Sequence, residues 1–336
     1  MTARIAVLGG GSWGTALANV LAANGSEVHV WARDPVVAEQ IDGESRNDKY
    51  LPGVSLEPTI AAATELEPVL RGASMILYVS PSQAIRDVLG AARPFLDGEP
   101  LVVSASKGIE LDSGLRMSQV VGEVLGAEFG ERTTVVSGPS FAAELARRLP
   151  TAITAASLVE ENAHRVQDVL QSEYLRVYTQ ADVIGTELGG SLKNIYAIAS
   201  GISDGLGLGN NARAATLTRG LAEMVRLTSR LGGQEATLSG LAGIGDLVLT
   251  CTGDLSRNRQ VGLAVGRGER LADVLAGMQQ VAEGVLTTKA TRDLAHEHDV
   301  EMPIVDAAFA ILFEEVPPQR VLAELMARAP KPERWS

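Results

Sequence analysis

The chain has 336 residues, of which 46% are hydrophobic and 21% are charged. This balance is typical of a globular protein with room for two hydrophobic cores, and it argues against a disordered chain. The formal net charge of −12 provides no general basic field, so nucleic acid and anionic membrane surfaces are not expected as partners. No uninterrupted apolar run has the length that crosses a bilayer, so we expect no membrane insertion.

Cysteine and histidine are scarce, which limits metal and redox chemistry. The single cysteine, Cys251, cannot form a disulfide within the chain, and it fits a reducing cytoplasm as a small buried hydrophobic residue. The four histidines and this cysteine do not form a spacing typical of a metal site. The sequence therefore predicts a cytoplasmic protein without a metal.

A glycine-rich segment follows the first predicted strand. The opening letters RIAVLGGGSWGTALA could pass for an export signal, but the glycines interrupt the apolar centre that such a signal needs. Residues 4–8 predict a short buried strand, residues 15–24 predict a helix, and residues 28–31 predict a second strand. We therefore expect a functional turn between a strand and a helix.

Three of these glycines match the dinucleotide-binding fingerprint G-x-G-x-x-G, which requires this setting. Gly9 would permit the tight turn, Gly11 would let the backbone approach a pyrophosphate, and Gly14 would let helix and strand pack closely. The phosphates would then lie at free N–H groups of the helix N-terminus. The alternative is an ordinary glycine-rich turn, but the strand–helix–strand context favours dinucleotide binding.

The end of the second predicted strand indicates which dinucleotide binds. An acid about 20 residues after the glycines takes the ribose 2′-hydroxyl of NAD, whereas an arginine there accommodates the 2′-phosphate of NADP. The chain has both, Arg33 and Asp34, followed by Pro35. We expect Asp34 to cap the helix that Pro35 begins and Arg33 to face the adenosine ribose, so that NADP(H) is preferred and NAD(H) is tolerated. The alternative is that Arg33 is a solvated loop cation and that Asp34 sets the choice.

Apolar, β-rich runs alternate with helical patterns through the first half of the chain. After residue 31 the β-rich runs lie at 75–80, 101–106, 133–138, 151–157 and 175–179. This alternation predicts an α/β fold with a mostly parallel sheet covered on both faces. Ligands on such a sheet bind at the carboxyl ends of the strands.

Beyond about residue 185 the strand signal fades. Residues 191–231 are rich in small residues with helical apolar spacing, and residues 271–326 continue in helical patterns broken by prolines. The sequence therefore predicts an all-helical second domain.

The carboxyl ends of the predicted strands supply the first chemical candidates. Lys107, directly after one strand, could hold a substrate oxygen or phosphate, or it could be an exposed loop lysine. After another strand, Gly138 offers an approachable backbone and Ser140 a hydroxyl, although either could equally cap the helix expected over residues 141–148.

Two ionisable residues of the second domain lie in apolar surroundings. Lys193 interrupts a glycine-rich helical run, and burial would lower its pKa toward neutrality, so that it could exchange a proton with a reacting carbonyl or hydroxyl. The alternative is a lysine whose ammonium reaches solvent at a domain interface. Asp246, in GLAGIGDL, could orient Lys193 or a substrate hydroxyl, or cap a helix.

A polar cluster follows Cys251. Ser256, Arg257, Asn258 and Arg259 combine two arginines with a hydroxyl and an amide, a plausible phosphate clamp because guanidinium groups bind phosphate in a bidentate manner. The alternative is a solvated loop.

Several stretches in chain order together resemble the bacterial NAD(P)-dependent glycerol-3-phosphate dehydrogenase family: GGGSWGTALA, SASKGIE, SGPSFAAELA, GGSLKNIYAIASGISDGLGLGNNARAA, GLAGIGDLVLTC, SRNRQVG and AEGVLTTK. The resemblance runs from about residue 4 to 315. It implies a Rossmann-type dinucleotide-binding domain, 1–185, followed by an all-α C-terminal domain like that of 6-phosphogluconate dehydrogenase, 186–330. It further implies interconversion of dihydroxyacetone phosphate and sn-glycerol 3-phosphate, usually in the reducing direction for phospholipid synthesis, by a homodimer.

The resemblance also implies roles for individual residues. Lys193 matches the proton donor and acceptor, acting with Lys107 and Asp246. The remaining substrate-contacting positions match Gly138, Ser140, Ser256, Arg257 and Asn258. The cofactor-contacting positions outside the glycine fingerprint match Ser12, Trp13, Arg33, Lys107, Ala142, Arg257, Val281 and Glu283. Family members often carry histidine at position 33, where this chain has arginine.

Two other functions are compatible with the same motifs. One is a dehydrogenase of the same two-domain build that acts on a carboxylate such as a 3-hydroxy acid. The other is a non-catalytic NAD(P)-sensing regulator, which the presence of Lys193 and Asp246 disfavours.

Overall fold

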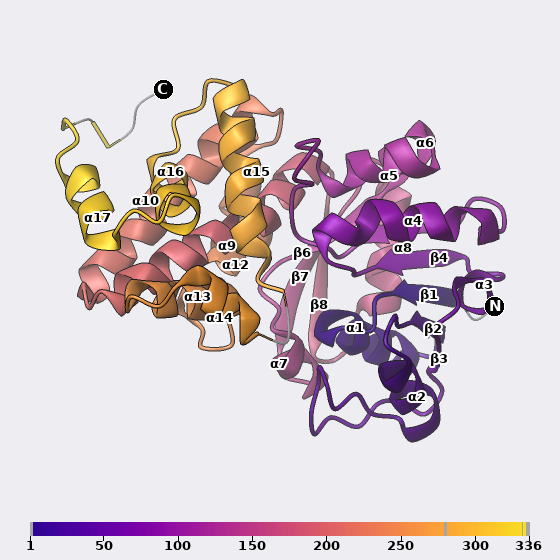
Figure 1. The fold of residues 1–336 in the computed structure, drawn as a ribbon. Coiled ribbons are helices and arrows are strands. Elements are labelled where there is room, and N and C mark those ends of the chain that lie inside the picture. Colours follow the sequence, from indigo (N-terminus) through magenta and orange to yellow (C-terminus); the bar gives the residue numbers. More distant parts are fainter. Residues whose placement is uncertain (1–2, 279–280, 331, 334–336) are drawn as a thin grey trace.

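An eight-stranded sheet forms the first half of the molecule (Figure 1). The computed structural model describes residues 3–278, 281–330 and 332–333. The strand order is β3-β2-β1-β4-β5-β6-β7-β8, and every neighbouring pair is parallel except β6 and β7. The strands are β1 (Arg4–Leu8), β2 (Glu27–Trp31), β3 (Ala61–Ala63), β4 (Met75–Tyr78), β5 (Leu101–Ser104), β6 (Thr134–Ser137), β7 (Thr151–Ala156) and β8 (Leu175–Gln180).

Helices cover both faces of this sheet because its strands alternate apolar residues between the two sides. In β1, Ile5 and Val7 pack in one core with α1, whereas Ala6 and Leu8 pack in another core with α4 and α5. The helices of this half are α1 (Ser12–Ala23), α2 (Pro35–Glu44), α3 (Leu66–Leu70), α4 (Ile85–Ala92), α5 (Met117–Leu125), α6 (Ala127–Arg132), α7 (Ala142–Ala146) and α8 (Glu160–Leu170), with short 3₁₀ turns η1 (Ser82–Ala84) and η2 (Arg93–Phe95).

The described residues after β8 form helices and no strand, as the sequence predicts. They comprise α9 (Val183–Gly205), α10 (Gly209–Arg230), α11 (Glu235–Leu238), the π-helical turn η3 (Leu241–Gly245), α12 (Asp246–Thr252), α13 (Arg257–Gly266), α14 (Leu271–Ala276), α15 (Glu283–Glu297), α16 (Pro303–Phe313) and α17 (Pro318–Met326).

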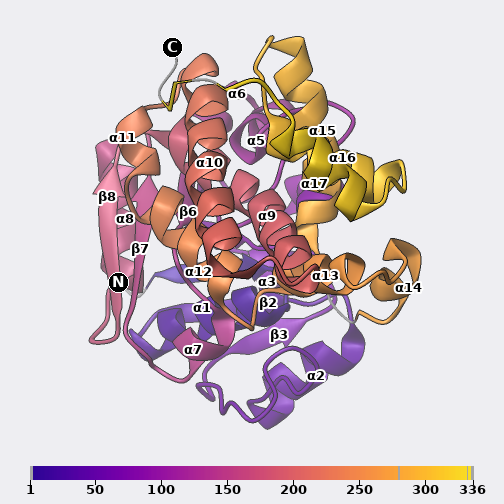
Figure 2. The same cartoon turned by 90° about the vertical axis from the view of Figure 1, so that its left-hand side faces the viewer.

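Helix α9 is the centre of the helical half and packs against α10, α12, α13 and α15 (Figure 2). Glycines make its crossing with α13 close. A Cβ atom on Gly201 would lie 2.2 Å from the Arg259 carbonyl oxygen, and one on Gly262 would lie 2.0 Å from the Ile198 carbonyl oxygen. The small residues of this stretch therefore serve packing within the chain. They also bring the start of α13 beside the face of α9 that carries Lys193.

Two details differ from the sequence predictions. Strand β3 was missed because its three alanines have low β propensity. Helix α1 begins at Ser12, three residues before the predicted start, since Gly14 lies inside the helix rather than in the turn. The helical pattern predicted over 191–231 is confirmed and is divided between α9 and α10, which are separated at Leu206–Leu208.

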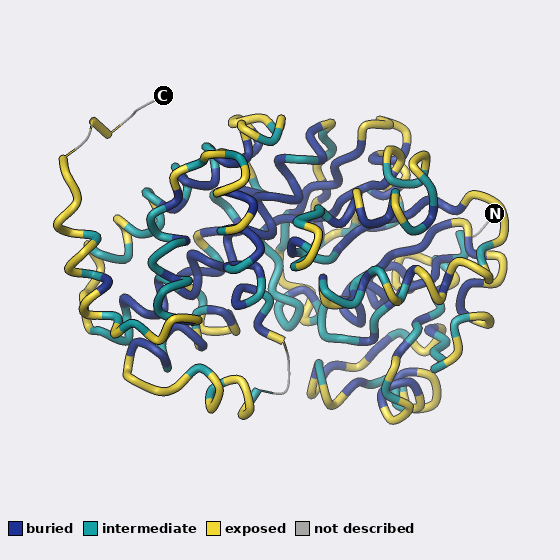
Figure 3. Tube along the Cα trace, turned by 45° about the horizontal axis from the view of Figure 1, so that its top comes forward, coloured by how far each residue is buried: buried dark blue, intermediate teal, exposed yellow. Residues whose placement is uncertain are grey.

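Burial is highest in the sheet and along the middle of the helical half, while residues 327–330 and 332–333, after α17, are exposed (Figure 3). Cys251 is completely buried, as expected. No helix within the described ranges has the length and hydropathy to cross a membrane.

Candidate functional site

A cavity of about 960 Å³ lies between the carboxyl ends of β1, β4 and β5 and the helical half. Strand order reverses at β1 and β4, where open α/β sheets bind their ligands. We call it the polar cavity. Among the residues that line it are most of the predicted site residues: Gly9, Gly11, Ser12, Trp13, Arg33, Lys107, Ser140, Ala142, Lys193, Ser256, Arg257, Asn258, Val281 and Glu283.

The three fingerprint glycines have the environments that their predicted roles require. Gly9 has φ +140°, and a Cβ atom there would lie 2.9 Å from the Val79 carbonyl oxygen. A Cβ atom on Gly14 would lie 2.0 Å from the Gly9 carbonyl oxygen, so helix and turn touch at this point. At Gly11 a Cβ atom would meet no heavy atom within 4 Å, which leaves its cavity side open to a ligand.

At the end of β2, Arg33 lines the cavity, while the neighbouring Asp34 accepts hydrogen bonds from other residues. Asp34 caps α2, as expected, since its Oδ1 atom accepts a hydrogen bond from Val36 N over 3.0 Å. Its Oδ2 atom accepts one from Lys49 Nζ over 2.6 Å, and this bond holds the pKa of Asp34 below its ordinary value. Arg33 is exposed and lines the cavity.

Two lysines from different halves of the molecule share one buried carboxylate. Lys193 Nζ, from α9, forms an ion pair with Asp246 Oδ1 and donates to Thr250 Oγ1 over 2.9 Å. Lys107 Nζ, after β5, donates to Asp246 Oδ2 over 2.6 Å and to the Gly138 carbonyl oxygen over 3.1 Å. Asp246 is 1% exposed and lies beneath the two ammonium groups. Lys107 is thus a paired side chain rather than an exposed loop lysine.

Burial sets the protonation behaviour of this cluster. Burial lowers the pKa of Lys193 to about 7; the attraction of Asp246 opposes this fall, and the positive charge of Lys107 adds to it. Burial alone would raise the pKa of Asp246, but the two ammonium groups outweigh it and hold that pKa below its ordinary value. The cluster therefore combines an ionised acid with a lysine that can gain and lose a proton near neutral pH.

The far wall of the cavity is the start of α13. Ser256 caps this helix, since its Oγ atom accepts a hydrogen bond from Arg259 N over 3.2 Å. Arg257 lines the cavity, donates to the Val281 carbonyl oxygen over 2.9 Å, and has a pKa lowered by burial. Asn258 is held between Asn194 and the N–H group of Gly284.

The sequence predicted a phosphate clamp of two arginines here, and the prediction is wrong for Arg259. Arg259 bonds to Asp204 and Asp254 and is not among the residues that line the polar cavity. On a helix, residues two apart do not share a face, so the Arg257 and Arg259 side chains point in different directions.

Ser140 does not cap a helix. The N-cap residue of α7 is Phe141, and the Ser140 hydroxyl donates a hydrogen bond to the Gly138 carbonyl oxygen over 2.9 Å.

Two residues of the site were not predicted. Thr250 bonds to Lys193, and its position four residues after Asp246 on a helix was an available signal, because such residues share a face. Ser82 donates through its Oγ and N atoms to the Glu283 carboxylate, over 2.5 and 3.2 Å. These two residues are 201 positions apart, and no local pattern could have paired them.

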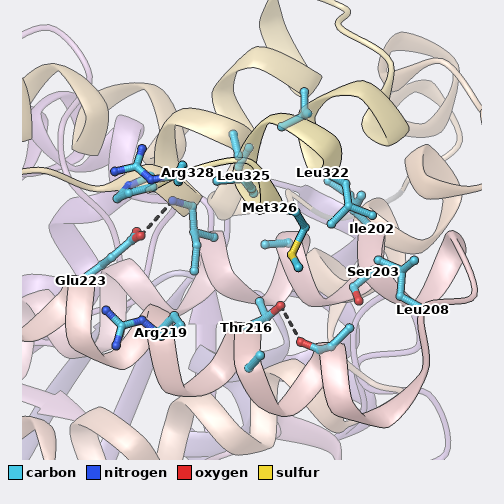
Figure 4. A pocket seen from close by; sticks show the side chains of 18 of the residues that line it. Ile202, Ser203, Leu208, Thr216, Arg219, Glu223, Leu322, Leu325, Met326 and Arg328 are labelled. Carbon is cyan, nitrogen blue, oxygen red and sulfur yellow. Dashed lines mark hydrogen bonds between the residues drawn. The ribbon is translucent and has the colours of Figure 1, made fainter. Parts of the chain in front are cut away.

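A second cavity, of about 570 Å³, lies between α9, α10, α16 and α17 (Figure 4). We call it the apolar cavity, since side chains such as Ile202, Leu322, Leu325 and Met326 form most of its wall. Glu223 lies at one end and accepts a hydrogen bond from Ile304 N over 2.8 Å. Across residues 3–278, 281–330 and 332–333, no group of three or more His, Cys, Asp or Glu side chains could hold a metal.

Comparison with known proteins places the chain in a family. Two family sequence models match the chain. The one described as NAD-dependent glycerol-3-phosphate dehydrogenase N-terminus matches residues 4–163, and the one described as its C-terminus matches residues 182–323. The chain belongs to the NAD-dependent glycerol-3-phosphate dehydrogenase family.

Relatives of this dehydrogenase family match over nearly the whole chain. A glycerol-3-phosphate dehydrogenase [NAD(P)+] of Geobacter sp. (strain M21) is 49% identical over 333 residues, 99% of each chain. One of Myxococcus xanthus is 47% identical over 330 residues, 98% of each chain. The crystal structure of glycerol-3-phosphate dehydrogenase from Coxiella burnetii is 42% identical, with a TM-score of 0.93, and the match covers 97% of this chain and 99% of that one.

Proposed function

We propose that the chain reduces dihydroxyacetone phosphate to sn-glycerol 3-phosphate with a nicotinamide dinucleotide, and that this reaction supplies glycerophospholipid synthesis. The observation that carries this proposal is the cluster of Lys193, Lys107 and Asp246, which joins the two halves of the molecule at the carboxyl end of the sheet. The names of the relatives, glycerol-3-phosphate dehydrogenase [NAD(P)+], support the same reaction.

The residues of the glycine turn fit a dinucleotide. The open space at Gly11 leaves room for a pyrophosphate beside the N-terminus of α1, where N–H groups and the helix dipole favour negative charge. Together with Gly9, Gly11 and Gly14, cofactor binding is assigned to Ser12, Trp13, Arg33, Lys107, Ala142, Arg257, Val281 and Glu283. A bound nicotinamide dinucleotide supplies the hydride of the reaction.

Lys193 is the proposed proton donor in the reducing direction. As the carbonyl carbon of the triose is reduced, its oxygen gains negative charge, and the Lys193 ammonium gives that oxygen a proton. Asp246 orients the ammonium. Lys107 donates a hydrogen bond to the Gly138 carbonyl oxygen and places a second positive charge near the reacting oxygen. In the reverse direction neutral Lys193 takes the proton back.

The phosphate of the triose is assigned to the start of α13. Ser256, Arg257 and Asn258 lie there at the cavity wall, and Ser140 lines the same cavity. Both Ser140 and Lys107 donate hydrogen bonds to the Gly138 carbonyl oxygen. Holding the phosphate at one end fixes the distance from the reacting carbon to Lys193, which lowers the entropic part of the barrier.

A steady-state assay tests the proposal. Purified protein should oxidise NADPH when dihydroxyacetone phosphate is added, and a panel of keto acids, including a 3-oxo acid, should give little turnover. Rapid turnover of a keto acid alone would instead favour a hydroxy-acid dehydrogenase, and nucleotide binding without any turnover would favour a sensing role.

The preference for NADP(H) over NAD(H) is proposed from the end of β2. Asp34 is occupied by the α2 cap and by Lys49, which leaves Arg33 as the group for the 2′-phosphate. Arg33→Ala should raise the KM for NADPH about tenfold, the value of one lost charge-assisted hydrogen bond, and change the KM for NADH little. Equal losses with both nucleotides would mean that another group sets the choice.

Three further assignments belong to this proposal. The division into domains 1–185 and 186–330 would place the boundary in the first turn of α9. The homodimer that the family resemblance implies is part of this proposal, and light scattering would measure its mass. A cytoplasmic location is supported by the unpaired, buried Cys251.

A further inference from the structure

A buried amide from outside the glycine turn holds that turn in place. Asn47 follows α2 and is 0% exposed. Its Nδ2 group donates to the Gly10 carbonyl oxygen over 3.0 Å and to Thr15 Oγ1 over 2.9 Å. The Thr15 hydroxyl donates to the same carbonyl oxygen over 3.3 Å. Two donors therefore fix the Gly10 carbonyl on the inner side of the turn.

Peptide geometry then determines where the next N–H group points. None of the described peptide bonds is cis, so the carbonyl of Gly10 and the N–H group of Gly11 point in opposite directions. With the Gly10 carbonyl held toward Asn47, the Gly11 N–H group points away from Asn47. Gly11 lines the polar cavity and has open space at its Cα, so this donor is available to a phosphate oxygen.

The short loop that carries Asn47 also reaches the end of β2. Asn47 Oδ1 accepts a hydrogen bond from Tyr50 N over 3.2 Å, and Lys49 bonds to Asp34. Both Lys49 and Tyr50 line the polar cavity with Arg33. One loop thus connects the turn assigned to the pyrophosphate with the strand end assigned to the ribose.

We propose that Asn47 is a positioning residue of the dinucleotide site: it sets the direction of the Gly11 N–H group, and with it the affinity for a pyrophosphate, without contacting the ligand. This inference rests on the placement of the pyrophosphate at the glycine turn in the proposed function. The competing explanation is that Asn47 only satisfies buried polar groups and stabilises the fold.

The chain offers a matched control for that competing explanation. Asn19, on α1, is 6% exposed, and its Oδ1 atom accepts a hydrogen bond from Glu57 N over 2.7 Å. It is a buried amide in the same half of the molecule, but its hydrogen bond goes to Glu57 rather than to the glycine turn. Asn19→Ala should therefore lower stability as Asn47→Ala does, without changing nucleotide affinity.

The experiment compares both variants with the wild type by NADPH titration, steady-state kinetics and urea unfolding. Asn47→Ala should raise the Kd and KM for NADPH about 10- to 100-fold, the range for one hydrogen bond to a charged group. The KM for NADH should rise by the same factor, because both nucleotides carry the pyrophosphate. The kcat at saturating NADPH and the KM for dihydroxyacetone phosphate should stay at wild-type values.

Each contrary result has a distinct meaning. Equal nucleotide affinities in Asn47→Ala and Asn19→Ala, with tight wild-type binding, overturn the role of Asn47 alone. A wild-type protein that binds no NADPH overturns both this role and the proposed function. If Asn47→Ala does not fold, Thr15→Val removes the bridging hydroxyl and should raise the KM for NADPH, whereas Thr15→Ser retains it. Equal KM values in that pair also overturn the proposal.

Discussion

Helix α9 borders two cavities of opposite chemistry. Lys193 and Asn194 face the polar cavity, where two lysines meet one carboxylate. Less than three turns later, Ile202 and Ser203 face the apolar cavity, where Glu223 is the buried acid (Figure 4). Both cavities have volumes typical of ligand sites, so volume alone does not distinguish them.

The difference lies in what the buried ionisable groups can do. In the polar cavity a proton can pass between Lys193 and a ligand, because the ammonium lines the cavity and Asp246 keeps it oriented. Glu223 instead accepts hydrogen bonds from Ile304 N and from Tyr196, so its lone pairs serve the packing of α10 against its neighbours. A perturbed pKa therefore indicates catalysis only where the group also faces reacting atoms.

Removing the charge from each cavity should give the largest contrast. Lys193→Met keeps roughly the length of the side chain but removes the amino group that donates the proton. The kcat should therefore fall about 10²- to 10⁴-fold, the usual contribution of general acid catalysis. NADPH affinity should remain at the wild-type value. Glu223→Gln should leave kcat unchanged. Near-normal turnover of Lys193→Met, measured by NADPH oxidation, would contradict the role of Lys193.

The second contrast is in stability. Burial raises the pKa of Glu223 from 4.5 to about 7. Between those two values the folded protein holds a proton that the unfolded chain has released, so stability should fall as pH rises through this window. At 1.36 kcal/mol per pKa unit the loss is at most roughly 3 kcal/mol.

Urea unfolding at pH 5 and pH 8 measures that loss. Glu223→Gln has no proton to release, so its free energy of unfolding should vary less with pH than that of the wild type. Parallel pH dependence in the two proteins would mean that the Glu223 carboxyl group titrates normally.

The third contrast is in the pH profile of the reaction. Burial lowers the pKa of Lys193 to about 7, and the donor must carry a proton to reduce the carbonyl. Above that pH, kcat/KM for dihydroxyacetone phosphate should fall about tenfold per unit, while kcat/KM for glycerol 3-phosphate oxidation should rise up to that pH and then level. Glu223→Gln should leave the pH dependence of kcat/KM unchanged in both directions. Reduction that is independent of pH between 6 and 9 would exclude Lys193 as the titrating donor.

The sequence could predict the residues whose signal is local. The glycine spacing, the strand that ends before Lys107 and the apolar run around Lys193 each depend on neighbouring residues, and the structure brings all three to one cavity. Thr250 lay within reach of the same reasoning, one helical turn after Asp246.

What the sequence could not predict depends on contacts between distant segments. Ser82 and Glu283 meet only because the fold brings the segment after β4 into direct contact with the start of α15. To predict that the Arg259 side chain points away from the cavity, one must know that α13 begins at Arg257. In a loop the same residues could place both arginine side chains together. The pairing of Lys107 with Asp246, 139 positions apart, likewise needed the fold.

The smallest contrast compares two buried hydroxyls. Thr250 accepts a hydrogen bond from Lys193, so Thr250→Val should leave that ammonium less well oriented and lower kcat about tenfold, the equivalent of one hydrogen bond. Thr250→Ser should restore most of the rate. Ser203, in the apolar cavity, has a buried hydroxyl without a partner in the described part of the chain, so Ser203→Ala removes no hydrogen bond and should leave kcat unchanged without lowering stability. If instead Ser203→Ala slowed the reaction as much as Thr250→Val, the two ends of α9 would be coupled, and the separation of the two cavities argued from their chemistry would be wrong.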